Sequence, residues 1–178
     1  MLKPLLGIIL GYSVLCFTAV AAEYAPLPTV KQVDLQRYAG RWFEIALIPN
    51  RFQENCICSN ALYQLKKGVL RVTNQCYNSK RSEHITAHGK AWPVAGSNNA
   101  KLLIQFFWPF KGDYWILDLD KKYRYALVGE PSRRYLWVLS RSPSMSVAQY
   151  RTIVNRAQQL GYDITQLVRT DQSCFKGI

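Results

Sequence analysis

The amino-acid sequence predicts an all-β fold, an eight-stranded antiparallel up-and-down β-barrel with a C-terminal α-helix packed on the barrel wall. Short β-type runs follow one another between Gly40 and Arg141, with turn residues between them and no helical pattern. Aromatic residues make up 13% of the chain, which suits pleated surfaces. Closing the strands into a barrel removes exposed edges, although a two-sheet sandwich remains the alternative. The single helix after the last run favours the barrel, because it can cover one wall.

The strands are expected in eight runs joined by short links. In chain order they are 41–48, 60–65, 69–77, 83–92, 101–108, 113–119, 123–129 and 134–141. Pro49 and Asn50 end the first run, and Lys66-Lys67-Gly68 predicts a hairpin between the second and third.

One amphipathic helix follows the strands. Ser144 or Ser146 can cap its N-terminus, and Gly161 ends it where a left-handed residue is commonly needed. Its apolar stripe contains Val147, Tyr150, Val154 and Ala157. The tail 164–170 is expected to add a ninth, short strand.

The first 22 residues have the pattern of a secretory signal peptide. Lys3 precedes an apolar run over 5–20, and small residues lead to a cleavage point after Ala22. A retained membrane anchor is the alternative, but the apolar run is short for a spanning helix. We expect residues 1–22 to be removed and 23–178 to form a single domain.

Cys16 raises the separate question of a lipid anchor. Bacterial lipoprotein signals place a small residue before the modified cysteine and a leucine three before it, whereas Leu15 and Ser13 stand there in this chain. The sequence therefore favours a soluble periplasmic or secreted protein over an outer-membrane lipoprotein.

Four cysteines remain after cleavage, an even number in an oxidising compartment: Cys56, Cys58, Cys76 and Cys174. They allow three disulfide pairings, which spacing alone does not separate. A zinc site is disfavoured because one residue, and not two to four, lies between the close pair.

The charge narrows the classes of function. The formal net charge is +12, with 11 acidic residues. A basic chain suits nucleic acid, an anionic membrane or a ligand with an acidic head. The scarcity of carboxylates and the lack of a Gly-x-Ser-x-Gly motif argue against an enzyme. His84 and His88 are four apart but lack a clear third ligand. We expect no catalytic residues, no metal site, no cofactor and no nucleic-acid partner.

Segments 34–46, 99–116, 119–129 and 135–143 carry a resemblance to a known family. The first contains Gly40-Arg41-Trp42, the second the run from Phe106 to Gly112, and the last ends at Arg141-Ser142-Pro143. In this order and spacing they resemble the lipocalin family, in its bacterial branch with outer-membrane lipoprotein Blc-like and apolipoprotein-D-like members. The resemblance runs from Val33 to Gln172 and implies the same barrel and helix.

The resemblance assigns structural roles. Trp42 is expected to close the barrel base with Arg141 packed across it. Gly40, the glycine of the Gly-x-Trp signature, is expected to be structural as well. It also implies disulfides Cys56–Cys76 and Cys58–Cys174.

Strand alternation and the family pattern together predict the barrel lining. The expected lining residues are Glu44, Ala46, Leu102, Ile104, Phe106, Tyr114, Ile116, Tyr135 and Trp137. Asp118 is expected as a further polar point. The alternative is that these aromatics only fill the barrel.

Hairpin tips alternate between the two ends of an up-and-down barrel. The end away from Trp42 should therefore collect Arg51, Lys80, Arg81, Lys111, Arg133 and Arg134. We expect Arg133 and Arg134 to hold a phosphate or carboxylate head. Other basic residues crowd the opposite end, so a basic surface all round is the competing interpretation.

The resemblance implies a non-enzymatic carrier of a fatty acid or lysophospholipid that serves the lipids of the cell envelope. The alternative is a basic secreted protein that binds polyanions at its surface. Peripheral contact with an anionic membrane and a homodimer are partners that the sequence leaves open.

Overall fold

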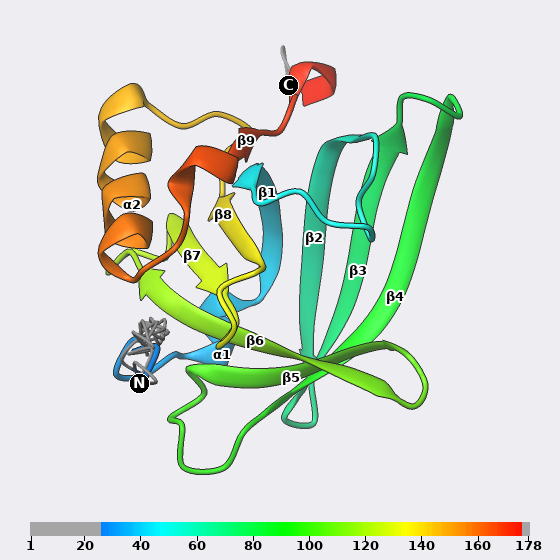
Figure 1. The fold of residues 1–178 in the computed structure, drawn as a ribbon. Helices are drawn as coiled ribbons and strands as arrows, with labels where there is room; N and C mark the ends of the chain where they lie inside the picture. Colours follow the sequence, from blue (N-terminus) through cyan, green and yellow to red (C-terminus); the bar gives the residue numbers. More distant parts are fainter. Residues whose placement is uncertain (1–25, 176–178) are drawn as a thin grey trace, which may run out of the picture.

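The computed structural model describes residues 26–175, and Figure 1 shows their fold. The elements are α1 (Leu35–Tyr38), β1 (Gly40–Leu47), β2 (Cys56–Lys66), β3 (Val69–Asn78), β4 (Glu83–Pro93), β5 (Lys101–Phe107), β6 (Phe110–Leu119), β7 (Tyr125–Gly129), β8 (Leu136–Ser140), α2 (Val147–Gln159), η1 (Ile164–Gln166), β9 (Val168–Arg169) and η2 (Ser173–Phe175). The signal segment 1–22 and Cys16 lie outside the described residues.

The strands form one closed antiparallel sheet. Their order is β2-β3-β4-β5-β6-β7-β8-β1, and the pairing of β1 with β2 closes the barrel. The short strand β9 adds to the outer end of β1, where Ala46 and Leu47 pair with it. The predicted eight-stranded barrel with one C-terminal helix is therefore confirmed.

Some boundaries differ from the prediction. β2 begins at Cys56 and not at 60, and β6 at Phe110 and not at 113, because backbone pairing with β3 and with β5 continues to these residues. The helix α1 was not expected. Its four residues are too few to show a helical period, and it forms because the Asp34 carboxylate accepts bonds from the backbone N–H groups of Gln36 and Arg37.

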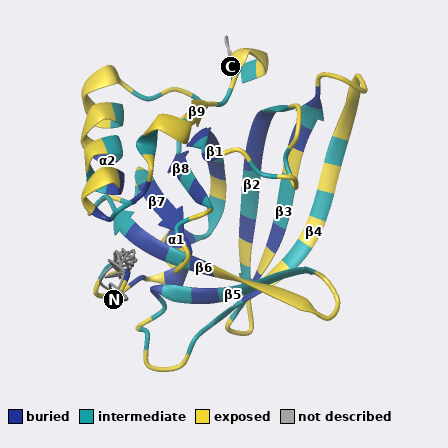
Figure 2. Cartoon of the chain, viewed as in Figure 1, coloured by how far each residue is buried: buried dark blue, intermediate teal, exposed yellow. Residues whose placement is uncertain are grey.

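The buried residues form two separate clusters (Figure 2). One lies inside the barrel and contains Trp42 and Tyr38, the two largest fully buried side chains of the described residues. The other lies between the outer wall and α2, where Ile153 and Ala157 pack with Val138 and its neighbours. Burying a side chain such as Ile153 contributes about 1.5–3 kcal/mol, so packing on the wall fixes α2.

The ends of α2 follow the predicted signals. Ser146 caps the N-terminus by accepting a hydrogen bond from the backbone N–H of Gln149, at 3.3 Å. Gly161 has φ of +84°, which a residue with a Cβ adopts at a cost. None of the helices between residues 26 and 175 is long and apolar enough to span a membrane.

Candidate ligand-binding site

The base of the barrel is closed by Trp42 and Arg141. The guanidinium carbon lies 3.8 Å from the Trp42 ring centroid, and the Trp42 indole N–H donates to the carbonyl of Tyr38 at 2.8 Å. Arg141 also donates to the carbonyls of Tyr38 and Ala39, at 3.1 and 2.9 Å, at the end of α1. One guanidinium therefore ties α1 and β1 to the chain that follows β8.

Gly40 makes this approach possible. Its φ is +97°, and a Cβ there would lie 3.1 Å from a terminal nitrogen of Arg141. A larger residue would be strained in its backbone and would press on the guanidinium.

Three tyrosine hydroxyls form a polar cluster above the base, which we call the tyrosine cluster: Tyr38, Tyr63 and Tyr114. The Tyr114 oxygen lies 2.7 Å from that of Tyr38 and accepts a bond from Tyr63 at 3.1 Å. Burial raises the pKa of all three hydroxyls, that of Tyr63 to about 12, so they stay protonated. Two hydrogen bonds use two of the three protons, which leaves one O–H without an acceptor among the described residues.

The predicted lining residues divide by depth. Leu102, Tyr114 and Ile116 are buried in the packed cluster near the base. Ile104, Phe106 and Trp137 pack against the same cluster but stay partly exposed. Tyr135 is also partly exposed, and its ring stacks on Trp137 with centroids 6.1 Å apart.

Two residues expected inside the barrel occupy other positions. The pairing of β1 with β8 shifts register between Glu44 and Ala46, so Ala46 pairs with Val138 and packs in the cluster under α2. The pairing of β6 with β7 shifts between Ile116 and Asp118, which pairs Asp118 with the outward Leu127. Each shift reverses the alternation of side chains, and the inward positions predicted for Ala46 and Asp118 are wrong.

Glu44 keeps its inward position and is buried in a polar network at the open half of the barrel. Its carboxylate accepts from the Gln53 side-chain NH₂ at 2.6 Å and from the Thr170 hydroxyl at 2.7 Å. The Trp137 indole N–H donates to the Gln53 side-chain oxygen, Oε1, at 2.8 Å. Burial raises the pKa of Glu44 above its usual value, and the hydrogen bonds oppose that rise.

The chain after α2 fills a seam between β1 and β2. These strands pair only as far as Phe43 and Asn60. Beyond that point the Gln172 amide donates to the carbonyls of Glu44 and Ser59, at 2.6 and 2.8 Å. Sequence reasoning missed Gln172, because no local pattern indicates that a tail residue bridges two distant strands.

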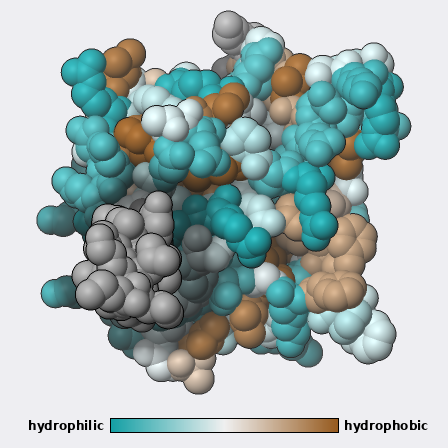
Figure 3. All heavy atoms as spheres, viewed as in Figure 1, coloured by the Kyte–Doolittle hydropathy of each residue, from teal (hydrophilic) through white to brown (hydrophobic). Residues whose placement is uncertain are grey.

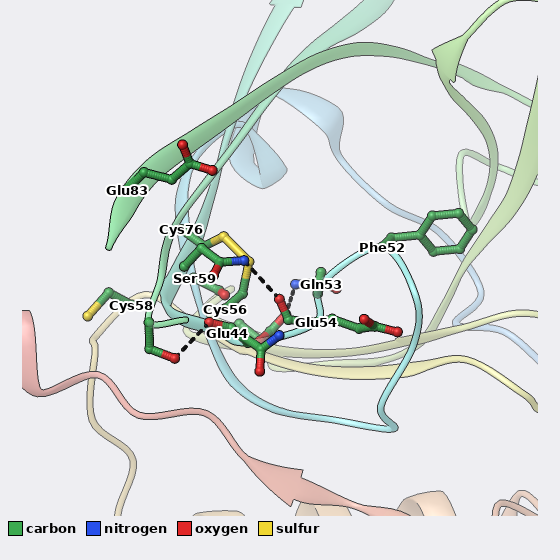
Figure 4. The surroundings of a disulfide bond; sticks show 12 residues. Glu44, Phe52, Gln53, Glu54, Cys56, Cys58, Ser59, Cys76 and Glu83 are labelled. Carbon is green, nitrogen blue, oxygen red and sulfur yellow. Dashed lines mark hydrogen bonds between the residues drawn. A yellow bond between two sulfur atoms is a disulfide. The ribbon is translucent and has the colours of Figure 1, made fainter. Parts of the chain in front are cut away.

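Two disulfides hold this region, as the resemblance implied. Cys58 is joined to Cys174 on the tail, and Cys56 to Cys76 across β2 and β3. Figure 4 shows Cys56 and Cys76 beside Glu44, Gln53 and Ser59. The Cys56–Cys76 disulfide therefore lies next to the Glu44 network at the open end.

The two arginines expected to hold a head group differ in position. The Arg133 guanidinium donates to the carbonyl of Leu160 at 2.7 Å, at the C-terminal end of α2. Arg134 is exposed, with its guanidinium carbon 5.8 Å from the centroid of Tyr135. The Glu130 carboxylate orders their loop by accepting from the backbone N–H groups of Ser132 and Arg134, at 2.8 and 2.7 Å.

The histidines lie away from the barrel interior. His84 pairs with Tyr77 and His88 with Thr73, positions that alternate with the inward Val72 and Cys76. Within residues 26–175, no three His, Cys, Asp or Glu side chains gather as a metal site would require.

Comparison with known proteins places these features in a family. A family model described as a lipocalin-like domain matches residues 33–172. Temperature-induced lipocalin-1 of Arabidopsis thaliana is 40% identical over 161 residues, which cover 85% of this chain and 86% of that protein. Outer membrane lipoprotein Blc of Escherichia coli (strain K12) is 37% identical over 159 residues, 86% of this chain and 90% of that protein.

The fold agrees with a solved structure at lower identity. Insecticyanin from the tobacco hornworm Manduca sexta matches with a TM-score of 0.67 at 18% identity, over 87% of each chain. That likeness concerns the fold alone, whereas the family model and the relatives above cover most of this sequence. The chain therefore belongs to the lipocalin family.

Proposed function

We propose that this protein binds a fatty acid or a lysophospholipid in its barrel and stores or transports it. The role of this binding is to maintain the lipids of the cell envelope. The observation that carries the proposal is the exposure of inward-facing residues in the open half. On β4, Ile85 and Ala87 face inward with Cys76 and Asn74, yet both stay partly exposed. Figure 2 shows the upper part of β4 without a buried residue. Inward residues of a filled barrel would be buried, so the open half has room for a ligand.

The walls of that space suit an acyl chain. Ile104, Phe106 and Trp137 present apolar surface, and burying it gains about 25 cal/mol per Å². The Asn74 side-chain oxygen is buried without a hydrogen-bond partner among the described residues. Such a group costs about 1–3 kcal/mol unless a donor reaches it. A ligand hydroxyl or a water molecule would supply that donor.

The rim supplies positive charge for the ligand head. Arg134 is exposed at the mouth beside Tyr135. We propose that Arg134 binds the phosphate or carboxylate head of the ligand. Arg133 instead binds the C-terminal end of α2. A binder of this kind needs no catalytic group, and we propose that the protein is not an enzyme.

The two disulfides support export to an oxidising compartment. Of the relatives, Blc is described as an outer membrane lipoprotein. For this chain we propose a soluble periplasmic or secreted form, which N-terminal sequencing of the protein recovered from its own cell tests.

A variant that blocks the barrel tests the binding proposal. Gly112 pairs with the inward Ile104, and a Cβ there would meet one described atom within 4 Å, the Ile104 Cγ2 at 3.8 Å. A side chain can therefore start from this position, and Gly112→Phe should place a ring in the lumen and weaken binding of a fluorescent fatty acid at least about tenfold. Gln75→Leu, on the outer face of β3, is the matched control. Equal affinity in wild type and Gly112→Phe would place the ligand outside the barrel.

A further inference from the structure

The end of the β5–β6 hairpin exposes three aromatic side chains, which we call the aromatic tip: Phe107, Trp108 and Phe110. Their exposed fractions are 74%, 87% and 76%. Exposed apolar side chains in a row cost solubility, and they commonly mark an interaction surface. The hairpin closes through the backbone pairing of Phe107 with Phe110, so its formation does not depend on burying these side chains.

The aromatic tip lies at the mouth end of the barrel. β5 runs from the base, where Leu102 pairs with Tyr114, toward the mouth. In Figure 1 the tip projects on the right, the same side as the end of the β3–β4 hairpin, and Figure 3 shows apolar surface on this side. Phe52, 64% exposed, lies on the β1–β2 loop at the same end.

Cations accompany these aromatics. The exposed basic side chains of the mouth end are Arg51, Lys80, Arg81, Lys111 and Arg134. Lys111 follows Phe110 directly in the chain, and its ammonium lies 5.3 Å from the ring centroid of Trp92 on β4. Basic residues also stand at the opposite end, such as Lys66 and Lys67. The positive charge at both ends attracts the protein to an anionic surface but does not fix its orientation. The aromatic tip, which lies at one end, would fix the orientation.

The area of the aromatic tip disfavours a second copy of the chain as its partner. An aromatic side chain buries about 150–250 Å², so three side chains at these exposures offer roughly 350–600 Å². A stable protein interface needs about 800 Å² per partner. Binding to a bilayer does not require a large surface of complementary shape. Tryptophan side chains also favour the interfacial layer of a bilayer.

We propose that Phe107, Trp108 and Phe110 insert into the interfacial layer of an anionic lipid bilayer and bring the barrel mouth against the membrane. The nearby cations contact anionic head groups. This docking does not depend on a ligand in the barrel, so it and the proposed carrier function can fail separately.

Vesicle co-sedimentation tests the docking, with phosphatidylcholine vesicles that contain about one quarter phosphatidylglycerol. The triple variant Phe107→Ser, Trp108→Ser, Phe110→Ser should bind at least about tenfold more weakly than wild type. Val147→Ser removes an apolar side chain that is 74% exposed at the start of α2, and it should bind as wild type does. All variants carry the same N-terminus, and unchanged thermal unfolding verifies their fold.

Two measurements separate insertion from other outcomes. Trp108 fluorescence should shift to the blue on vesicles and be quenched by brominated acyl chains. Undiminished binding of the triple variant would overturn the proposal, as would binding that salt abolishes without quenching. A wild-type dimer that the triple variant loses, with vesicle binding unchanged, would assign the tip to a second copy. Fatty-acid affinity in vesicle-free solution should be equal in both proteins.

Discussion

Removing the Arg141 guanidinium should lower stability by an amount that the structure predicts. In Arg141→Ala, the part-buried carbonyls of Tyr38, Ala39 and Tyr123 each lose one hydrogen bond. The Tyr38 carbonyl keeps the Trp42 indole N–H as a donor. Each bond contributes about 1 kcal/mol net. The contact with the Trp42 ring at 3.8 Å adds about 1 kcal/mol. The contacts with exposed carbonyls add little, so the free energy of unfolding should fall by about 4 kcal/mol.

Urea unfolding followed by tryptophan fluorescence measures this loss. For a domain of this size the thermal midpoint should fall by about 8–16 °C. Arg141→Lys is the matched control, because an ammonium keeps the charge but lacks the planar fork that reaches several carbonyls. It should recover less than half of the loss. A change below about 1 kcal/mol in Arg141→Ala, or full recovery by lysine, would refute the role given to the guanidinium.

Three further predictions concern the open half of the barrel and its seam. Because the folded state raises the pKa of Glu44, the stability that its protonated form contributes should be lost as pH rises above about 4.5. Urea titrations should then show wild type weakening relative to Glu44→Gln between acid and neutral pH, and a constant difference would contradict this. Replacing Cys58 and Cys174 by serine opens a link across 116 residues and should cost about 4–5 kcal/mol, measured against the disulfide-bonded protein. Arg133→Ser should lower stability by about 1 kcal/mol with ligand affinity unchanged, whereas Arg134→Ser should weaken lysophospholipid binding in titrations without altering stability. The reverse pattern would exchange their roles.

The architecture could be predicted because it depends on signals that lie close together in the chain. Short alternating runs and turn residues indicate successive hairpins, and Ser146 and Gly161 set the ends of α2. Successive antiparallel hairpins of this number leave few ways to remove the edges, so barrel closure follows.

The site was harder to predict because two features depend on the backbone and on distant contacts. Nothing in the residues around Glu44 or Ile116 signals the register shift that follows each of them, and strict alternation therefore placed Ala46 and Asp118 on the wrong face. The bridge made by Gln172 joins residues 113 and 128 positions away. Only the folded chain brings them together.

Arg133 shows the same limit at the rim. Its place in the β7–β8 loop was predicted, but its direction depends on where α2 ends against the wall, with Leu160 in reach of the guanidinium. Arg134, one residue on, is exposed, and its Nε donates to the Ser132 hydroxyl at 3.0 Å. A basic pair in a loop is therefore not evidence that both side chains serve one ligand.

The central claim is that the open half of the barrel holds one lipid. Native mass spectrometry of the protein recovered from its own compartment tests it most directly. We expect a mass increase of one fatty acid or one lysophospholipid per chain, reduced in Gly112→Phe and retained in Gln75→Leu. Protein that carries no lipid and takes up none when fatty acids and lysophospholipids are offered would contradict it.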